Sequence, residues 1–352
     1  MAKKSAAKDG GKTKRLVLFD AHAVLHRAYH ALPDFSSAKG EPTGALYGLS
    51  TMLMKIVAEL KPDYMAACYD LPGGTFRNEI YEDYKAGRKE ADKELVLQMK
   101  RSRDIWSAFS IPIYEMPGFE ADDILGTIAL HLKDEPIEVV VASGDMDTLQ
   151  LVDGTRVKAY TLKKGITDTV IYDEDKVRER FGFGPKLLPD FKGLRGDPSD
   201  NIVGIKGIGE KTATTLITTF GSIEEMYAAL KKDKKKFAAA AKLSPRVLEL
   251  IENGEEEALF SKTLATIRTD APINFNLPKE SWQEAVSYER VATLFTELEF
   301  RSLLERAKQF FKKNGAVVAA EEVHTPLFVD EREQKEVAVA LSLLTGEPEP
   351  TL

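Results

Sequence analysis

The stretch IEVVVASGDMD, residues 137–147, decides the fold class, because an apolar run rich in valine ends in two closely spaced aspartates. A short apolar run of this kind is typical of a strand buried on both faces of a parallel sheet. Residues 16–20 (LVLFD) and 64–70 (YMAACYD) have the same form, and each ends in an aspartate. Helical patterns fill the intervals, at 45–60, 94–109 and 121–132. Alternating strands and helices predict an α/β domain with a parallel sheet and helices on both faces.

The length and composition indicate a soluble protein of two domains. A chain of 352 residues can bury a full core without disulfides or metals. Its single cysteine, Cys68, excludes a disulfide framework and a cysteine-based zinc site, and we expect it to be inert within a strand. No apolar run approaches the roughly 20 residues of a membrane span, and the basic N-terminus lacks the apolar segment of a signal peptide. We therefore expect a cytoplasmic protein with no membrane partner.

Changes in composition divide the chain into parts. From about residue 185 the pattern becomes purely helical, and beyond about residue 313 it becomes acidic. The polar, aromatic segment at about 72–93 is weakly periodic and predicts a mobile segment over the sheet edge. The predicted divisions are a disordered basic N-terminus (1–14), an α/β domain (15–184), an all-helical region (185–307) and an acidic tail (308–352) with one helix at 331–344.

Acidic residues gather at the ends of the predicted strands and at the starts of helices and loops. Because residues just past the carboxyl ends of parallel strands meet at one edge of the sheet, these side chains should converge there. So many carboxylates in one place need cations to neutralise them, and an all-oxygen ligand set suits Mg²⁺ or Mn²⁺. Two such ions about 4 Å apart form a site for phosphodiester cleavage. The acids are Asp20, Asp70, Glu120, Asp122, Asp123, Asp145, Asp147, Asp197 and Asp200.

Each of these acids also has an ordinary structural explanation. Carboxylates at helix starts are common caps, and an aspartate after a strand is common in turns. For Glu120, Asp122 or Asp123 alone, a capping role is the favoured interpretation. The joint pattern favours a metal site, because a helix cap needs one acid and the sequence has several at four separate places.

Three histidines follow the first strand at helical spacing: His22, His26 and His30. No cysteine or further carboxylate lies at ligand spacing within that stretch. We therefore interpret them as one face of an amphipathic helix and not as metal ligands.

The stretch GIKGIGEKTA, residues 204–213, predicts two helices joined by a glycine-rich hairpin. Its backbone amides and the following helix start can hold a phosphate without reading base sequence, and its carbonyl groups can hold a monovalent cation. A tight helix connection with glycine caps explains the same pattern equally well. The candidate contacts are Gly204, Lys206, Gly207, Gly209, Lys211 and Thr212.

Basic and aromatic side chains stand within reach of the same sheet edge. In YKAGR, Tyr84 can stack on an unpaired base, while Lys85 and Arg88 can hold a phosphate and offset developing charge. Arg27 follows the first strand, and Arg77 is a weaker phosphate candidate. The ordinary alternative for each is a solvated helix face.

Five motifs, in this order, resemble the 5′-nuclease (flap endonuclease) family, as represented by the N-terminal domain of bacterial DNA polymerase I. The similarity covers about residues 15–307 and closes with LEFRSLL at 298–304. The motifs are LFDAHAVLHRAYHAL, FRNEIYEDYKAGRK, GFEADDILGTIA, SGDMDTLQLV and GDPSDNIVGIKGIGEKTA.

The resemblance implies a PIN-like nuclease core, with residues 72–93 as a helical arch, and a helix-hairpin-helix region that grips the downstream duplex and can hold K⁺. It implies two or more Mg²⁺ ions, replaceable by Mn²⁺, at the nine acids named above. It also implies phosphate and transition-state contacts from Lys85 and Arg88, with Tyr84 lining the arch. The expected activity is 5′-3′ exonuclease and 5′-flap endonuclease hydrolysis in DNA replication and repair.

The expected partners are branched or 5′-ended duplex DNA with a single-stranded flap, and RNA–DNA primers. The chain is expected to act as a monomer at the bacterial nucleoid, with a separate DNA polymerase as a further partner. Residues 336–344 (EVAVALSLL), followed by 350–352 (PTL), are similar to the helix that opens the segment after the 5′ nuclease in some polymerases. The chain is then either a split or truncated polymerase I or a free-standing nuclease.

Two other function classes are compatible with parts of the sequence. A structure-specific DNA-binding module that has lost catalysis should lack a metal ligand or the arch lysine, and neither is missing. A ribonuclease with a similar acidic α/β core would not need the glycine-rich hairpin.

The formal net charge of −7 alone argues weakly against a nucleic-acid partner. Residues 316–352, however, carry eight acids and two bases, so residues 1–315 carry 48 acids and 47 bases. Setting aside the nine site acids leaves 39 acids against 47 bases, a basic surface that suits DNA. We therefore expect deletion of the acidic tail to raise DNA affinity modestly at low salt.

Overall fold

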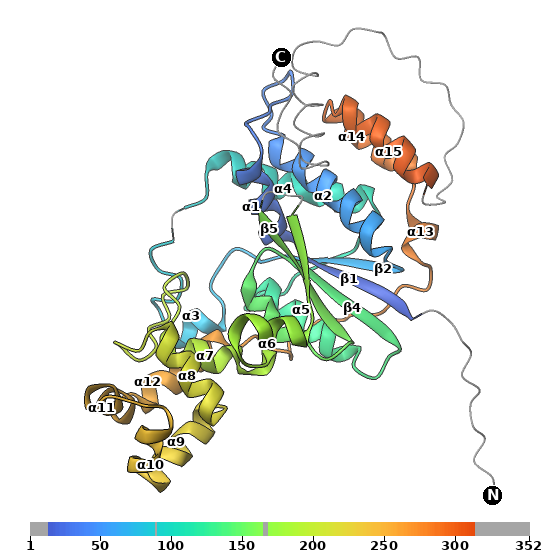
Figure 1. The fold of residues 1–352 in the computed structure, drawn as a ribbon. Coiled ribbons are helices and arrows are strands. Elements are labelled where there is room, and N and C mark those ends of the chain that lie inside the picture. Colours follow the sequence, from blue (N-terminus) through green and yellow to red (C-terminus); the bar gives the residue numbers. More distant parts are fainter. Residues whose placement is uncertain (1–12, 89, 165–167, 314–352) are drawn as a thin grey trace, which may run out of the picture.

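The computed structural model describes residues 13–88, 90–164 and 168–313, which form a six-stranded sheet with helices on both faces and a helical extension (Figure 1). The strand order is β3-β2-β1-β4-β5-β6, and all neighbours are parallel except β5 and β6, which are antiparallel. The strands are β1 (Lys14–Asp20), β2 (Tyr64–Cys68), β3 (Ile113–Tyr114), β4 (Ile137–Ser143), β5 (Val157–Lys164) and β6 (Asp168–Tyr172).

The described helices alternate with the strands and then continue alone after β6. Those before β6 are α1 (Ala21–Ala31), α2 (Gly44–Leu60), α3 (Phe76–Ile80), α4 (Lys93–Ala108), α5 (Ala121–His131) and the 3₁₀ helix η1 (Met146–Leu151). Those after it are α6 (Glu174–Phe181), η2 (Pro185–Leu187), α7 (Leu188–Arg195), α8 (Glu210–Phe220), α9 (Ile223–Lys232), α10 (Lys234–Ala240), α11 (Pro245–Asn253), α12 (Glu255–Ala265), α13 (Trp282–Ala285), α14 (Tyr288–Glu297) and α15 (Arg301–Lys313).

Strand β1 shows why the sheet is covered on both faces. Val17 and Phe19 point into a core shared with α1, α2 and α4, whereas Leu16 and Leu18 point into a second core shared with α5. Successive residues of a strand face opposite sides, so a strand that is buried on both faces must be apolar at every position. This is the pattern that the sequence predicts for residues 16–19.

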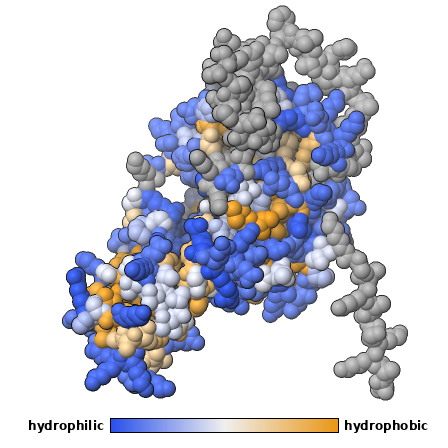
Figure 2. Space-filling model, viewed as in Figure 1, coloured by the Kyte–Doolittle hydropathy of each residue, from blue (hydrophilic) through white to orange (hydrophobic). Residues whose placement is uncertain are grey.

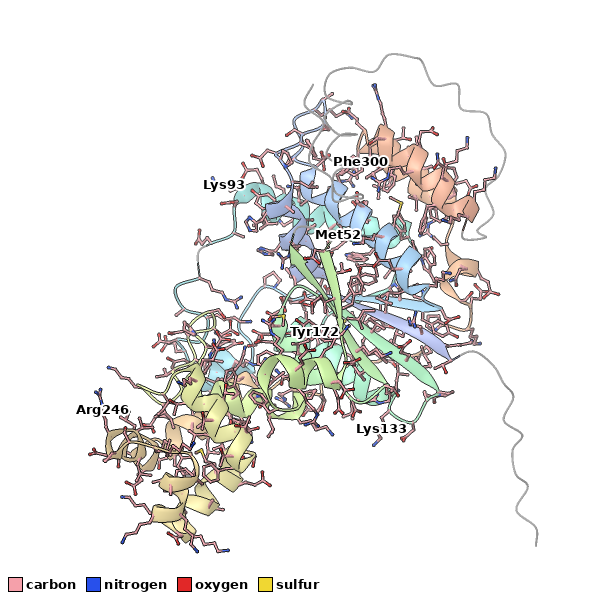
Figure 3. All side chains as sticks on the ribbon, in the orientation of Figure 1. Met52, Lys93, Lys133, Tyr172, Arg246 and Phe300 are labelled. Atoms are coloured by element: carbon pink, nitrogen blue, oxygen red, sulfur yellow. The ribbon has the colours of Figure 1, made fainter. Side chains whose placement is uncertain are left out.

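The helical extension, α7–α12, has a core of its own that also reaches the end of the sheet. Leu194, Leu216, Met226 and Phe237 are buried in it together with Tyr172 of β6. Figure 3 shows Arg246, at the start of α11, at the far end of this extension, and Tyr172 near the centre of the molecule.

The last three helices return to the sheet and do not belong with that extension. Trp282 donates its indole N–H to the carbonyl oxygen of Phe109 (2.8 Å), and Phe295 and Phe311 are buried in the core that contains α2 and α4. Figure 1 shows α14 and α15 beside α2, away from α8–α12. The sequence prediction placed all residues from 185 to 307 in one helical region, and the structure separates α13–α15 from it.

The predicted fold class is confirmed, with differences in detail. The sheet is mixed, because β6 runs antiparallel to β5, and the sequence pattern missed both strands and β3. Strand β1 begins at Lys14, inside the segment predicted to be disordered, and α15 runs past the predicted boundary at residue 307 to Lys313. Residues 1–12 of the predicted N-terminal segment and the tail helix at 331–344 lie outside the described residues.

One face of the molecule shows mainly hydrophilic residues. The face in Figure 2 is mostly blue, with separate orange patches. In the described part of the chain, no helix combines the length and apolarity that crossing a membrane requires.

Candidate metal and phosphate site

The carboxyl edge of the sheet gathers acids from three strand ends and one helix start. Asp20 ends β1, Asp70 follows β2 and Asp145 follows β4. Glu120 and Asp122, at the start of α5, complete the group, and all five line one cavity of ≈ 250 Å³. Parallel strands therefore bring together residues that are up to 125 positions apart in sequence, as the motif spacing predicts.

Hydrogen bonds hold two of these carboxylates in place. Asp20 caps α1 by accepting from the amide of Ala23 (2.9 Å), and its other oxygen accepts from the hydroxyl of Ser143 (2.7 Å). The same Ser143 hydroxyl accepts from the amide of Asp145 (2.9 Å), so it links the ends of β1 and β4. Sequence reasoning missed Ser143; its position before Gly-Asp, at the strand end, is the signal that could have identified it.

Asp70 is held from both sides. Its Oδ1 accepts from the amide of Ala121 (2.7 Å), and its own amide donates to Nδ1 of His22 (3.1 Å). Burial lowers the pKa of His22, which keeps Nδ1 available as an acceptor. The histidine thus holds the backbone of Asp70 in place at this edge.

Crowding makes these carboxylates hard to ionise without a cation. Burial, together with the charges of Asp70 and Asp145, raises the pKa of Asp20 to about 7. Burial and the charges of Asp20 and Asp145 also raise the pKa of Asp122 well above its ordinary value. A cluster of acids with raised pKa values is the electrostatic signature of a cation site.

A second group of acids lies next to the first. Asp147, Asp197 and Asp200 each offer a carboxylate oxygen within 4.8 Å of the others. Lys192 of α7 forms ion pairs with Asp147 and, at 2.5 Å, with Asp197. Burial alone would raise the pKa of Asp197, but this ammonium group holds it below its ordinary value. Sequence reasoning missed Lys192. It lies five residues before Asp197, on one of the many helices of the predicted all-helical region.

The residues of the YKAGR stretch lie against both groups of acids. Lys85 donates to Glu120 (2.6 Å) through its ammonium and to the carbonyl oxygen of Asp200 (2.9 Å) through its amide. Arg88 forms an ion pair with Asp200 and donates to the carbonyl oxygen of Ser199 (3.2 Å). The two cations therefore lie at the sheet edge, as predicted, and each is paired with a carboxylate there.

Tyr84 is placed differently from the prediction. Its side chain is 4% exposed, and its hydroxyl donates to Glu120 and to Asp200 (3.2 Å each). Burial and these two carboxylates raise the pKa of the phenol, so it remains a donor. A ring enclosed in this way is not available to stack on a base, because its hydroxyl is bound between Glu120 and Asp200 and the Arg77 guanidinium lies 5.9 Å from its centre.

Asp123 and Arg77 also depart from the predicted roles. Asp123 is fully buried, and both of its oxygens accept from the Arg77 guanidinium (2.8 and 2.9 Å). Arg77 is 2% exposed and cannot contact a phosphate in this arrangement. The structure contradicts the predictions of Asp123 as a metal ligand and Arg77 as a DNA contact, because the two neutralise each other inside the protein.

Arg27 faces a larger cavity of ≈ 640 Å³ that continues from Asp145 and Asp147 toward α6 and α7. Lys192 and Arg195 line its other side. The space beside the second acid group is thus bordered by positive charge, which suits a phosphate backbone.

The glycine-rich hairpin divides into a buried part and an exposed part. Gly204 is buried at φ +63°, and its amide donates to the hydroxyl of Ser261 (3.0 Å). Gly204 therefore cannot donate to DNA, contrary to its predicted role. The exposed or half-exposed members are Lys206, Gly207, Gly209, Lys211 and Thr212, with Gly209 as the N-cap of α8.

The donor set fits hard divalent cations. Asp20, Asp70, Glu120, Asp122, Asp145, Asp147, Asp197 and Asp200 supply only carboxylate oxygens at this edge. Oxygen ligands without cysteine or coordinating histidine favour Mg²⁺ or Mn²⁺ over zinc.

Two family models match consecutive parts of the chain. The model described as "5'-3' exonuclease, N-terminal resolvase-like domain" matches residues 15–182, and "5'-3' exonuclease, C-terminal SAM fold" matches residues 183–288. The two matches together cover most of the chain and all the acids described above.

Curated relatives are named DNA polymerase I. The chain is 42% identical to that of Bacillus caldotenax over 293 residues, which are 83% of this chain and 32% of the relative. It is 38% identical to that of Chloroflexus aurantiacus over 342 residues, which are 95% of this chain and 34% of the relative. The chain thus spans about a third of the length of these relatives.

Among solved structures, the T5 D15 protein co-crystallised with metal ions shares the fold with a TM-score of 0.58 at 16% identity, covering 86% of this chain and 98% of that one. Human GEN1 in complex with Holliday junction DNA gives 0.51 at 11% identity, covering 81% of this chain and 67% of that one. With both family models matched over contiguous segments, the chain belongs to the 5′-3′ exonuclease family, which confirms the family inferred from its motifs.

Proposed function

We propose that this chain is a Mg²⁺-dependent structure-specific nuclease that removes 5′ flaps and degrades 5′ ends of DNA, and that it also removes RNA primers. The observation that carries the proposal is the convergence of eight carboxylates at one sheet edge, beside Lys85, Arg88 and Lys192. Such a site combines the ligands for hard cations with side chains that attract a phosphate.

Two divalent ions would be held by the two groups of acids. The first group is Asp20, Asp70, Glu120, Asp122 and Asp145, and the second is Asp147, Asp197 and Asp200. When bound, the ions would activate water and offset the negative charge that develops on the phosphate. The T5 D15 relatives were crystallised with metal ions, and one of them with DNA and metal ions, which supports this assignment.

The chain's own cations would change partners during this reaction. Lys85, Arg88 and Lys192 now pair with Glu120, Asp200 and Asp197. Divalent ions at the carboxylates would compete for the same oxygens, so these cations would become free to bind the phosphate of the strand. Burial would lower the pKa of Lys85, but Glu120 and Asp200 hold it above its ordinary value, so Lys85 enters the reaction protonated.

The hairpin would hold the duplex beside the cleavage site. Lys206 and Lys211 are exposed, and the start of α8 presents free amides to a phosphate. We propose that the exposed part, from Lys206 to Thr212, contacts one strand of the duplex, and that carbonyl groups of the hairpin hold K⁺ there. Contacts of this kind position DNA without reading its sequence.

The polymerase relatives support a role in replication and repair. We propose that the chain acts as a monomer in the cytoplasm, at the nucleoid, together with a DNA polymerase activity that generates the flaps. A polymerase displacing a strand produces the 5′-flapped duplex that this site would cut.

A flap cleavage assay tests the proposal. A duplex with a 5′-labelled single-stranded flap is incubated with the protein and Mg²⁺, and in parallel with EDTA. We expect release of the flap near the junction with Mg²⁺ and none with EDTA. A substrate that is bound but stays intact at high protein concentration would instead support a DNA-binding module without catalysis.

A further inference from the structure

Arg77 is fully engaged inside the protein. Its Nε donates to the carbonyl oxygen of Leu264 (2.9 Å), and Nη2 donates to that of Thr266 (2.8 Å). Nη1 and Nη2 also donate to the two carboxylate oxygens of Asp123, and Nη1 lies 3.3 Å from Glu120. The Arg77 side chain, on α3, thus joins the start of the segment 76–88 to α5 and to the end of α12.

Asp123 is equally saturated. Its Oδ2 accepts from Arg77 and from the amide of Glu120 (3.0 Å), while its Oδ1 accepts from Arg77 and from the amide of Arg268 (2.8 Å). Four donors use the acceptor capacity of a carboxylate, so no lone pair remains for a metal ion. Its neighbour Asp122, by contrast, lines the acidic cavity.

The contacts around Asp123 connect it, through Glu120, to the acidic cavity. One of the two amides that donate to Asp123 belongs to Glu120, whose carboxylate binds Lys85 through Oε1 and Tyr84 through Oε2. The position of Glu120 therefore depends on Asp123 on one side and determines the position of Lys85 on the other. A displacement of about 1 Å at a reacting group can lower a rate about 10²-fold.

The burial of this pair distinguishes it from the other ion pairs of the segment. The Arg77 side chain is 3% exposed and that of Asp123 is 0% exposed, whereas the Arg88 side chain, paired with Asp200, is 52% exposed. Aromatic rings close the site, since the Arg77 and Arg268 guanidinium groups lie 4.5 and 4.7 Å from the ring centre of Phe76. Arg88 can leave its partner for a phosphate, and Arg77 cannot.

We propose that Arg77 is a positioning residue that fixes the segment 76–88 on helix α5, with Asp123 as its permanent counter-ion, and thereby sets Glu120 and Lys85 for cleavage. The proposal rests on the proposed nuclease function for its effect on rate. Its effects on the segment itself are independent of that function.

The test compares single and paired substitutions. Arg77→Met alone leaves a buried carboxylate without its partner and is expected to fold poorly, so the main variant is Arg77→Met with Asp123→Asn, which removes both charges together. Arg77→Lys tests rescue, because it keeps the charge but loses the paired geometry. Arg15→Met, which breaks the ion pair with Glu138 (2.6 Å) on the opposite end of β1, is the matched control.

Two readouts do not depend on activity. The first is the rate of tryptic cleavage after Lys85 and Arg88, which reports the order of the segment. The second is the Mg²⁺ dissociation constant by calorimetry. For the paired variant we expect tryptic cleavage at least tenfold faster than in the parent. Its Mg²⁺ dissociation constant should stay within threefold of the parent's value. Single-turnover flap cleavage should fall about 10²-fold, with Arg77→Lys in between and the control unchanged.

Two results would overturn the proposal. In the first, the paired variant regains the parent's melting temperature and also its tryptic and flap cleavage rates, which would reduce Arg77 to a structural ion pair. In the second, Asp123→Asn weakens Mg²⁺ binding at least tenfold, as Asp122→Asn is expected to do, which would make Asp123 a ligand. If the parent itself does not cut flaps, the proposed function fails, while the tryptic and calorimetric results still decide the role of Arg77.

Discussion

At the level of single residues, almost every carboxylate at the acidic sheet edge pairs with a cation or hydrogen-bond donor of the protein. Lys85 binds Glu120, Arg88 binds Asp200 and Lys192 bridges Asp147 and Asp197. These pairs neutralise charge that would otherwise repel within a partly buried space. They also keep three cations within reach of any phosphate that approaches the acids.

Substitution of Lys85 by alanine should affect the chemical step more than binding. Loss of one preorganised cation at a reacting phosphate lowers the rate by about 10²- to 10³-fold. We expect this loss in single-turnover flap cleavage, with the dissociation constant for the flap substrate changed less than about threefold. Lys133→Ala, at an exposed position after α5, is the matched control. Undiminished turnover of Lys85→Ala would remove this lysine from the site.

The raised pKa of Asp20 predicts a pH dependence of the metal-free protein. Because its folded pKa, about 7, lies above the ordinary value of 3.8, the folded state binds this proton more tightly than the unfolded state. The resulting stability is present at low pH and is lost as the pH rises through 7. Asparagine does not titrate, so Asp20→Asn lacks this loss of stability. The free energy of unfolding of Asp20→Asn minus that of the parent should therefore be roughly 2 kcal/mol larger at pH 8 than at pH 5.

Urea unfolding in EDTA at the two pH values measures this difference. Added Mg²⁺ should stabilise the parent more at pH 8 than at pH 5, because protons compete with the metal for the carboxylate. If the free energies of unfolding of Asp20→Asn and the parent differ by the same amount at both pH values, the pKa of Asp20 is not raised.

The sequence could identify the acids but could not divide them by role. In EADD, Asp122 and Asp123 are chemically identical neighbours, and the turn of the helix sends one into the acidic cavity and the other toward Arg77. Two partners of Asp123, Arg77 and the amide of Arg268, lie 46 and 145 positions away along the chain, on α3 and after α12. Such contacts depend on the tertiary structure, which local patterns do not encode.

At the level of elements, the hairpin after Asp200 depends on close backbone packing. A Cβ atom on Gly204 would lie 2.2 Å from the amide nitrogen of Gly196, and the φ of +63° disfavours any side chain there. Gly204 therefore holds the end of α7 against the hairpin, and its role is structural.

Gly204→Ala should lower the free energy of unfolding by at least about 2 kcal/mol, since both strain and overlap oppose a methyl group. Gly209→Ala is the comparison, because a Cβ atom there meets nothing within 4 Å and φ is −94°. Its cost should stay below about 1 kcal/mol, typical of an alanine at an N-cap. Chemical denaturation of both variants measures this, and equal losses would contradict the packing argument.

The elements with strong periodicity were predictable, and those with mixed patterns were not. The predicted strands at 16–20, 64–70 and 137–142 match β1, β2 and β4 to within two residues at each end. By contrast, β5 reads VKAYTLKK, where lysines interrupt the apolar pattern, and β3 has only two residues. Lys158 is tolerated in the sheet because Glu138 of the neighbouring strand accepts from it (2.8 Å).

At the level of the whole molecule, charge is separated along the chain. Of the residues before 316, 48 are acids and 47 are bases. Eight acids remain at the sheet edge once Asp123 is excluded from the site. Setting these eight aside leaves 40 acids against 47 bases, so the rest of this part of the chain is still basic. A basic body around the acidic sheet edge suits a DNA partner, and the net charge of −7 conceals it.

This separation predicts salt-dependent binding through the hairpin. The variant Lys206→Ala/Lys211→Ala should bind duplex DNA more weakly and should reduce the slope of log affinity against log salt by about 1 to 2. Fluorescence anisotropy across a salt series in Ca²⁺ or EDTA measures the slope, with Lys133→Ala/Lys279→Ala as the control for charge. An unchanged slope would place the duplex elsewhere on the molecule.

Single-turnover cleavage of a 5′-labelled flap duplex in Mg²⁺, by the parent and by Asp145→Ala, shows whether the acidic edge is a nuclease site. Asp145 is exposed at the acidic edge, so its removal should leave the fold intact. If the eight carboxylates form a metal site for phosphodiester hydrolysis, the parent releases the flap near the junction, and the variant binds the same substrate without cutting it. Cleavage by Asp145→Ala at the parent's rate would show that hydrolysis does not depend on this carboxylate edge.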